Sequence, residues 1–251
     1  MARIQINQIS VQFPIYNADT RSLKTRLVHM TTGGRIGRDA GNRVCVEALT
    51  DVTLTFEHGD RVALVGHNGA GKTTLLRVLA GIYEPVRGTL SCEGRVVSLF
   101  DLSLGMNPEA SGFENIMLRG RFLGLNGRQV RERMDDIAAF TELGDYLAMP
   151  VRTYSTGMAL RLAFAVCTSI EPEIMVMDEW IGAGDAAFLE KATHRLDDFI
   201  GRAGILVVAS HSTALLEKNC NKGVLMHAGR DEAFGPIGDV LRAYEKHKPA
   251  T

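Results

Sequence analysis

Apolar and polar positions alternate in some stretches of the chain and recur at helical spacing in others, which predicts a mixed α/β protein. The predicted strands are 3–13 (an edge strand with one irregularity), 44–56, 62–65, short strands within 88–97, 174–177, 205–209 and 224–227. The predicted helices are 72–80, a mostly helical 113–147 interrupted at Gly124 and Gly127, 157–169, 186–200, and a terminal helix opened by Pro236.

The order of these elements predicts how the chain is organised. Strands dominate the beginning, an all-helical stretch follows the helix at 72–80, and helices alternate with strands toward the end. Such alternation implies a parallel sheet with crossover helices. We therefore expect an α/β core with an inserted helical subdomain.

The segment 17–43 differs in composition from its surroundings. It carries six arginines and lysines against Asp19 and Asp39. Its part 21–30 has helical spacing, whereas 31–42 is predicted to be loop-like or disordered. Two interpretations stay open: a solvated surface insertion, or a basic amphipathic element that faces a membrane surface or a partner.

Composition excludes several classes of protein. The 251 residues carry a formal net charge of −1, which does not favour nucleic acid as a partner. No run approaches the roughly 18 apolar residues of a membrane span, and the N-terminus lacks an apolar signal core. Four scattered cysteines without a C-x-x-C pair suggest reduced, structural thiols.

Residues 66–74 read G-H-N-G-A-G-K-T-T directly after the apolar run 62–65. This is the phosphate-binding pattern G-x-x-x-x-G-K-[ST], here between a predicted strand and a predicted helix. Lys72 would reach the β- and γ-phosphates, and the Thr73 hydroxyl would hold Mg²⁺. A plain glycine-rich turn is the alternative. The predicted nucleotide-binding residues of this loop are Gly66, His67, Asn68, Gly69, Ala70, Gly71, Lys72, Thr73 and Thr74.

The apolar strand 174–177 ends in Asp178 and Glu179. A phosphate-loop nucleotidase needs an acid here to support Mg²⁺, and Asp178 fits that role. Glu179 points elsewhere and could polarise the attacking water. Solvated acids at a strand end are the alternative.

Several ordered motifs make nearly the whole chain, 1–246, resemble the ATPase subunit of an ABC transporter. The segment Y-S-T-G-M (154–158) resembles the signature motif of that family, 183–185 resembles its D-loop, and His211 resembles its switch histidine. Glu114 and Asn115 resemble a common pair of its helical subdomain. The resemblance implies the ABC ATPase fold: a P-loop NTPase core with a parallel sheet, an N-terminal antiparallel β-subdomain and an inserted helical subdomain (about 101–168). It leaves 247–251 as a tail.

Two departures from the usual motifs point to one branch of the family. The signature is not L-S-G-G-Q, and Asp101 stands at the Q-loop position. Both features resemble the exporters of cell-surface polysaccharides such as O-antigen, capsule and teichoic acid. The alternatives are an ABC ATPase subunit for another substrate, or a soluble ABC ATPase outside transport.

The resemblance also implies a mechanism. Two copies would pack head to tail and enclose two ATP molecules, with Ser155 and the N–H of Gly157 on the γ-phosphate held by the opposite copy. Asp185 would couple the two sites. Glu179, His211 and Lys72 would carry catalysis, and Thr73, Asp178 and, to a lesser degree, Asp101 would support Mg²⁺; an exposed turn acid is the alternative for Asp101.

An aromatic ring is expected to stack on adenine, with Phe13 the first candidate and Tyr16 the second; core or surface aromatics are the alternative for both. The partner implied by the resemblance is a polytopic permease that receives the surface around 101–115 and makes most contacts with the glycan. The implied location is the cytoplasmic face of the inner membrane, as a peripheral subunit.

Overall fold

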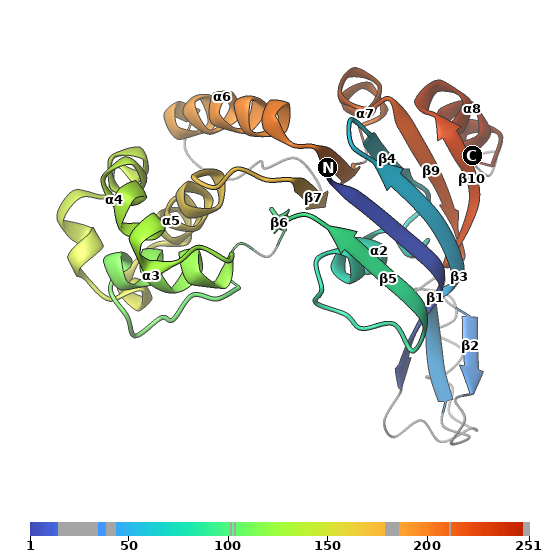
Figure 1. The fold of residues 1–251 in the computed structure, drawn as a ribbon, viewed down its shortest axis with the longest axis horizontal. Coiled ribbons are helices and arrows are strands. Elements are labelled where there is room, and N and C mark those ends of the chain that lie inside the picture. Colours follow the sequence, from blue (N-terminus) through green and yellow to red (C-terminus); the bar gives the residue numbers. More distant parts are fainter. Residues whose placement is uncertain are drawn as a thin grey trace. The chain divides into compact units, whose positions relative to one another are not determined.

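The computed structural model describes residues 1–14, 35–38, 44–100, 102, 104–178, 186–210 and 212–247 (Figure 1). Its strands are β1 (Arg3–Pro14), β2 (Arg35–Arg38), β3 (Val44–Glu57), β4 (Arg61–Val65), β5 (Arg87–Glu93), β6 (Val96–Ser98), β7 (Ile174–Asp178), β8 (Ile205–Ala209), β9 (Lys222–His227) and β10 (Arg230–Pro236). Its α-helices are α2 (Lys72–Leu79), α3 (Gly112–Phe122), α4 (Gly127–Thr141), α5 (Thr156–Thr168), α6 (Ala186–Arg202), α7 (Thr213–Asn219) and α8 (Ile237–His247). Two 3₁₀ turns, Gly144–Ala148 and Val151–Thr153, precede α5.

The chain forms two compact units. Unit 1 comprises Met1–Val96, Val176–Glu179 and Gly204–Thr251, and unit 2 comprises Val97–Met175 and Trp180–Ala203. The predicted helical stretch 101–168 falls within unit 2, and α6 belongs to the same unit. The predicted phosphate-binding loop falls within unit 1.

The first sheet of unit 1 has the strand order β2-β3-β1-β5. β1 pairs antiparallel with β3 and with β5, so Ile4 lies opposite both Phe56 and Cys92. The prediction of an edge strand for 3–13 is therefore wrong. Alternation of polar and apolar residues reports which face of a strand is buried, and it says nothing about how many neighbours the backbone pairs with. The pairing also shifts register at several points between Ile6 and Gln12, not at one.

The second sheet has the order β10-β9-β4-β8-β7-β6. β4 runs parallel to both β8 and β9, which confirms the predicted parallel core. Val62 to Val65 are all buried, as expected for a central strand covered on both faces. The carboxyl end of β4 leads directly into the phosphate-binding loop and α2.

Four local predictions differ from the structure. The stretch predicted as loop, 31–42, contains β2, which pairs antiparallel with β3 and places Ile36 opposite Val46. Gly127 begins α4 instead of interrupting a helix, since Asn126 caps it by accepting hydrogen bonds from the backbone N–H groups of Arg128 and Gln129. β10 and α7 were not predicted. The rest of 17–43, including the predicted helix 21–30, lies outside the described residues.

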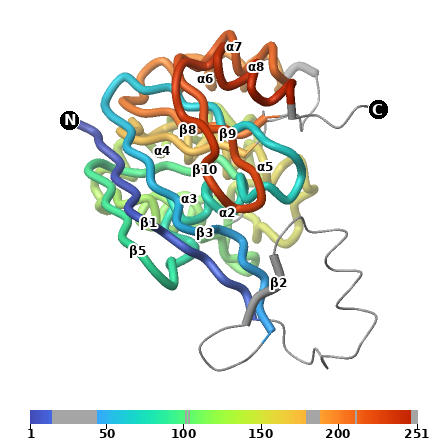
Figure 2. The backbone as a smooth tube through the Cα atoms, turned by 90° about the vertical axis from the view of Figure 1, so that its right-hand side faces the viewer, coloured from blue at the N-terminus to red at the C-terminus, as the bar shows by residue number. Residues whose placement is uncertain are grey.

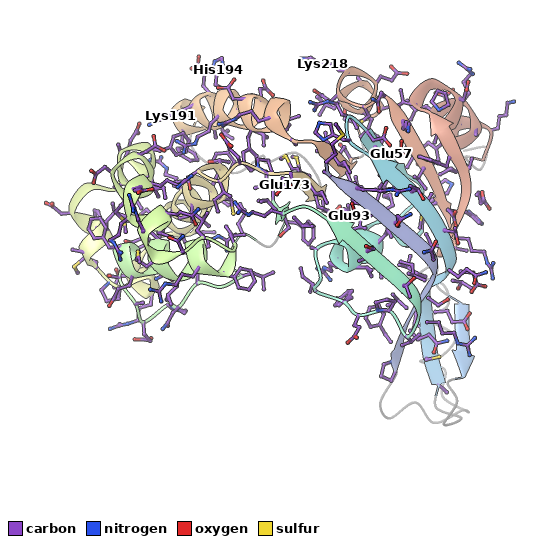
Figure 3. All side chains as sticks on the ribbon, in the orientation of Figure 1. Glu57, Glu93, Glu173, Lys191, His194 and Lys218 are labelled. Atoms are coloured by element: carbon purple, nitrogen blue, oxygen red, sulfur yellow. The ribbon has the colours of Figure 1, made fainter. Side chains whose placement is uncertain are left out.

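Unit 2 is held by an aromatic cluster between α4, α5 and α6. The rings of Phe140, Phe164 and Phe188 pack with centroids 5.7–6.3 Å apart. Two cations of α6 lie over Phe140: the Lys191 ammonium is 4.8 Å and the Arg195 guanidinium 4.2 Å from its centroid (Lys191 is labelled in Figure 3). This cluster makes α6 part of unit 2.

None of the four cysteines, all in described positions, forms a disulfide. Burial raises the pKa of Cys92 and Cys167, and raises that of Cys220 to about 12. A protonated thiol is a poor nucleophile and a poor metal ligand. None of the helices in the described ranges is long and apolar enough to cross a bilayer.

Candidate nucleotide-binding site

The loop between β4 and α2 needs glycine at its first position. Gly66 has a φ of 154°, and a Cβ built on it would lie 2.3 Å from the carbonyl oxygen of Met226 in β9. Gly71 has a φ of 103°, and its Cβ would lie 3.0 Å from the carbonyl oxygen of Ala48. Any larger residue at either position would displace backbone, so the motif glycines let the loop pass close to β9 and β3.

Lys72 is the first residue of α2 and folds back over the loop. Its Nζ donates hydrogen bonds to the carbonyl oxygens of Gly66 at 2.6 Å and His67 at 3.0 Å. Gly71 is the N-cap residue of α2, and it has no side chain that could accept a hydrogen bond from the first amides of the helix. A helix N-terminus with a lysine above it favours an anion, in keeping with a phosphate site.

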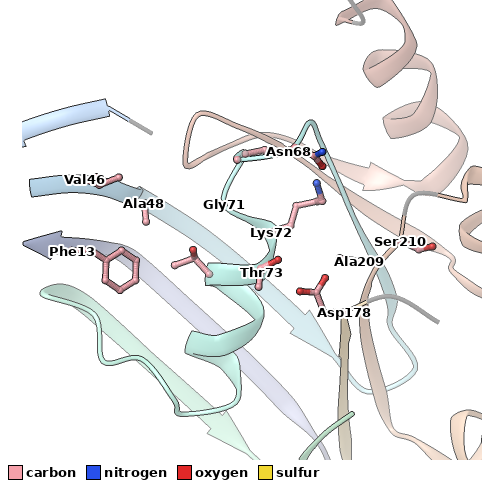
Figure 4. Close-up of a pocket in the computed structure, with 13 residues that line it drawn as sticks. Phe13, Val46, Ala48, Asn68, Gly71, Lys72, Thr73, Asp178, Ala209 and Ser210 are labelled. Carbon is pink, nitrogen blue, oxygen red and sulfur yellow. The ribbon is translucent and has the colours of Figure 1, made fainter. Parts of the chain in front are cut away.

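A cavity of about 320 Å³ lies in front of this loop, within unit 1 (Figure 4). In Figure 4, the side chains of Lys72, Thr73 and Asp178 surround the same space, with Phe13 at its far end. The structure therefore brings together two sequence motifs that are more than a hundred residues apart. The lining residues are Phe13, Val46, Ala48, Asn68, Gly69, Ala70, Gly71, Lys72, Thr73, Thr74, Asp178, Ala209 and Ser210.

The donors in this cavity fit Mg²⁺. Thr73 supplies a hydroxyl oxygen and Asp178 a carboxylate oxygen, which are the hard ligands that Mg²⁺ prefers. Within the described residues, no group of three or more His, Cys, Asp and Glu could hold a metal ion by itself.

Phe13, the first candidate for stacking on adenine, lines the cavity at the phosphate-binding loop. It is half-buried near the end of β1 and lines the cavity together with Val46 and Ala48 of β3. The Tyr83 ring packs against it in a T-shaped arrangement, with centroids 5.1 Å apart and an interplanar angle of 70°. Arg77 donates a hydrogen bond to the Tyr83 hydroxyl at 2.8 Å, and this bond holds the ring that packs against Phe13. Tyr16 lies outside the described residues.

The signature segment (154–158) lies in unit 2, at the start of α5. The Ser155 hydroxyl caps the helix by accepting a hydrogen bond from the N–H of Met158 at 3.2 Å. Tyr154 donates to the carbonyl of Tyr146 at 2.6 Å, and burial raises the pKa of its phenol. Ser155 and Gly157 line a second cavity, of about 460 Å³, and not the one at the phosphate-binding loop.

Four predicted site residues lie outside the described part of the chain: Asp101, Glu179, Asp185 and His211. Several residues that line the first cavity were not predicted from the sequence. Ser210 had a usable signal, because it directly follows β8 and precedes His211. Val46 and Ala48 had none, because their place depends on how β3 approaches the loop in three dimensions.

This geometry defines a class of protein, the phosphate-loop nucleotide-binding proteins, in which a loop at the end of one strand holds the phosphates and an acid at the end of another strand of the same sheet supports the metal. The family profile described as ABC transporter matches residues 49–182. The chain belongs to the ABC transporter family, and within it to the ATP-hydrolysing subunits.

Two relatives and one solved structure agree with this assignment. The O-antigen export system ATP-binding protein RfbE of Yersinia enterocolitica is 48% identical over 222 residues, which is 88% of this chain and 93% of the relative. The O-antigen export system ATP-binding protein RfbB of Klebsiella pneumoniae is 34% identical and covers 97% of both chains. A solved ATP-binding subunit of an ABC transporter matches with a TM-score of 0.68 at 22% identity, covering 98% of this chain and 95% of that chain, which shows the shared fold.

Proposed function

We propose that this chain is the ATPase subunit that powers export of a cell-surface polysaccharide, of the kind represented by O-antigen, across the cytoplasmic membrane. The observation that carries the proposal is the cavity that joins Lys72, Thr73 and Asp178 in front of the phosphate-binding loop. The substrate class rests on the relatives, which are named for O-antigen export.

We assign the steps of hydrolysis to residues of this chain. Lys72 and the loop amides hold the β- and γ-phosphates, while Thr73 and Asp178 would hold Mg²⁺, which when bound neutralises phosphate charge. Glu179 orients the attacking water and His211 contacts the γ-phosphate. These roles need positioning and charge, and they require no covalent intermediate on the protein.

A second copy of the chain completes the site. Ser155 is the N-cap of α5 and Gly157 lies in its first turn; among the described residues, a Cβ built on Gly157 would come within 4 Å of the Ser155 hydroxyl alone, at 3.9 Å. The start of α5 is therefore open to an anion brought by a partner. We infer a head-to-tail homodimer in which this segment closes on the γ-phosphate held by the other copy, and in which Asp185 couples the two sites.

The membrane partner is a polytopic permease that holds this subunit at the cytoplasmic face and makes most of the glycan contacts. Leu118 and Phe122, four residues apart on α3, are 43% and 62% exposed. The Phe122 ring lies against Gly105, in the segment that follows Asp101: a Cβ on Gly105 would lie 3.0 Å from it. We assign this apolar surface to a short amphipathic helix of the permease, with Asp101 contributing to the same interface.

We further propose that residues 1–246 act as one ABC ATPase domain. Its helical subdomain spans about 101–168, its basic insertion about 17–43, and 247–251 is a tail.

Complementation of a deletion strain tests the function, with surface polysaccharide measured by antibody or lectin labelling of intact cells. The wild-type chain should restore display, whereas Lys72→Ala should abolish it through loss of ATP binding, and Phe122→Asp through loss of the permease contact. Ala139→Asp, at an exposed position of α4, is the matched control and should restore display. Normal display with Lys72→Ala, at equal protein abundance, would contradict the proposal.

A further inference from the structure

The phosphate-binding loop contacts three elements near the end of the chain: β9, the turn between β9 and β10, and α8. Gly66 lies against the Met226 carbonyl of β9. The carbonyl of Ala70 accepts a hydrogen bond from the N–H of Gly229, in the turn between β9 and β10, at 3.0 Å. A third contact is the ring of His67 against the ring of Tyr244 in α8, with centroids 5.3 Å apart and an interplanar angle of 51°.

The sequence explains why α8 reaches the loop. α8 packs along β9 (Figure 2), and Gly223 of β9 makes room for it, since a Cβ there would lie 3.0 Å from Val240. Val240 is 2% exposed. Tyr244 follows Val240 by four residues, so both lie on the same face of the helix. The face of α8 that packs on β9 therefore also carries the Tyr244 ring that contacts His67.

We propose that Tyr244 is a positioning residue for ATP, acting through His67 on the phosphate-binding loop. The His67 carbonyl accepts a hydrogen bond from the Lys72 ammonium at 3.0 Å. A shift of His67 therefore moves the anchor of Lys72 as well as the loop amides. The inference rests on the proposed role of the loop in binding ATP, and it adds that the terminal helix sets how well the loop is preformed.

The test compares Tyr244→Leu, which keeps apolar volume but removes the ring, with Tyr244→Phe, which keeps the ring. Because aromatic pairs contribute modestly beyond buried area, Tyr244→Leu should raise the KM and Kd for ATP roughly fivefold, with kcat changed less than about twofold. Tyr244→Phe should restore wild-type values. Arg242→Ala is the control on the same helix, since Arg242 is exposed and bonds to Asp239 one turn away.

Two further measurements separate positioning from a structural role. A purely structural role would lower the melting temperature of Tyr244→Leu and leave the ATP affinity of the folded protein unchanged, which would overturn the inference. In a double-mutant cycle, His67→Ala should weaken ATP binding less in the Tyr244→Leu background than in wild type; strict additivity would also overturn it.

The variant Lys72→Ala distinguishes a failure of the inference about Tyr244 from a failure of the proposed function. If wild type binds ATP, Lys72→Ala does not, and Tyr244→Leu binds as wild type, only the inference about Tyr244 fails. If wild type does not bind ATP, the proposed function fails together with the inference.

Discussion

At Lys72, the ammonium group donates two hydrogen bonds to carbonyls of its own loop, so its charge is already held beside the amides that face the cavity. A preorganised cation of this kind needs little rearrangement when phosphate arrives. Glycine at 66 and 71 lets the loop adopt this shape, because a side chain at either position would meet backbone. This part of the site can be predicted from the sequence because its requirements are local: the glycines avoid steric clashes with backbone, and Lys72 supplies positive charge.

Phe13 carries a testable prediction about the base. Removing its ring with Phe13→Ala should weaken ATP binding by about 1–2 kcal/mol, roughly five- to thirtyfold, because stacking on adenine is lost. Binding of inorganic tripolyphosphate, which has no base, should change less than about twofold. Isothermal titration of both ligands checks this, and equal losses for the two would show that Phe13 acts on the loop and not on the base.

At the scale of elements, α3 carries two buried polar side chains, Asn115 and Arg119, that hydrogen-bond to the segment before the helix. Asn115, 1% exposed, accepts from the N–H of Asn107 at 2.7 Å and donates to the carbonyls of Asn107, Ala110 and Ser111. Arg119, 2% exposed, donates to the carbonyl of Leu104 and to the Cys167 sulfur of α5. The two side chains together fix the segment 104–111 to α3.

Replacing Asn115 by Ala should therefore destabilise the protein by about 2–4 kcal/mol, because buried backbone groups lose their partners. Urea unfolding followed by circular dichroism measures the change. Arg128→Ala, which breaks an ion pair between side chains that are 85% and 53% exposed, is the control and should cost less than about 0.5 kcal/mol. A loss below 1 kcal/mol for Asn115→Ala would mean that segment 104–111 is held by other contacts.

The strands differ in how far their places in the fold can be predicted from the sequence. The buried runs that form β4, β7 and β8 were predicted nearly to the residue, because a strand covered on both faces has a continuous apolar sequence. The interior position of β1 depends on backbone pairing with both β3 and β5, and β2 depends on pairing with β3, so neither was predicted. For the same reason the motif gives Lys72 and Thr73 directly, whereas Val46 and Ala48 enter the cavity only through the tertiary fold.

At the scale of the whole molecule, the phosphate-binding loop and the signature segment belong to different units. The proposed dimer predicts that two inactive variants complement each other when mixed. Lys72→Ala damages one half of the composite site, and Gly157→Asp damages the other by placing a negative charge beside phosphate. An acid in the first turn of α5 does not harm the helix itself.

After subunit exchange, about half of the dimers should contain one copy of each variant, and each of these has one of its two sites intact. The mixture should therefore recover about a quarter of the wild-type ATPase rate. The rate is measured as phosphate release after the two purified variants are mixed and incubated together. A mixture that hydrolyses ATP only at the summed rate of its components, although subunit exchange is demonstrated, would argue against a site shared between two copies.

The central claim, that ATP bound at this loop drives polysaccharide export, is tested most directly in proteoliposomes that contain this subunit and its permease. Lipid-linked polysaccharide supplied on the side of the ATPase should become protected from added glycosidase when ATP and Mg²⁺ are present. With Lys72→Ala it should stay fully accessible. Protection that develops equally without ATP or with Lys72→Ala, or ATP hydrolysis with no protection in an intact complex, would contradict the account.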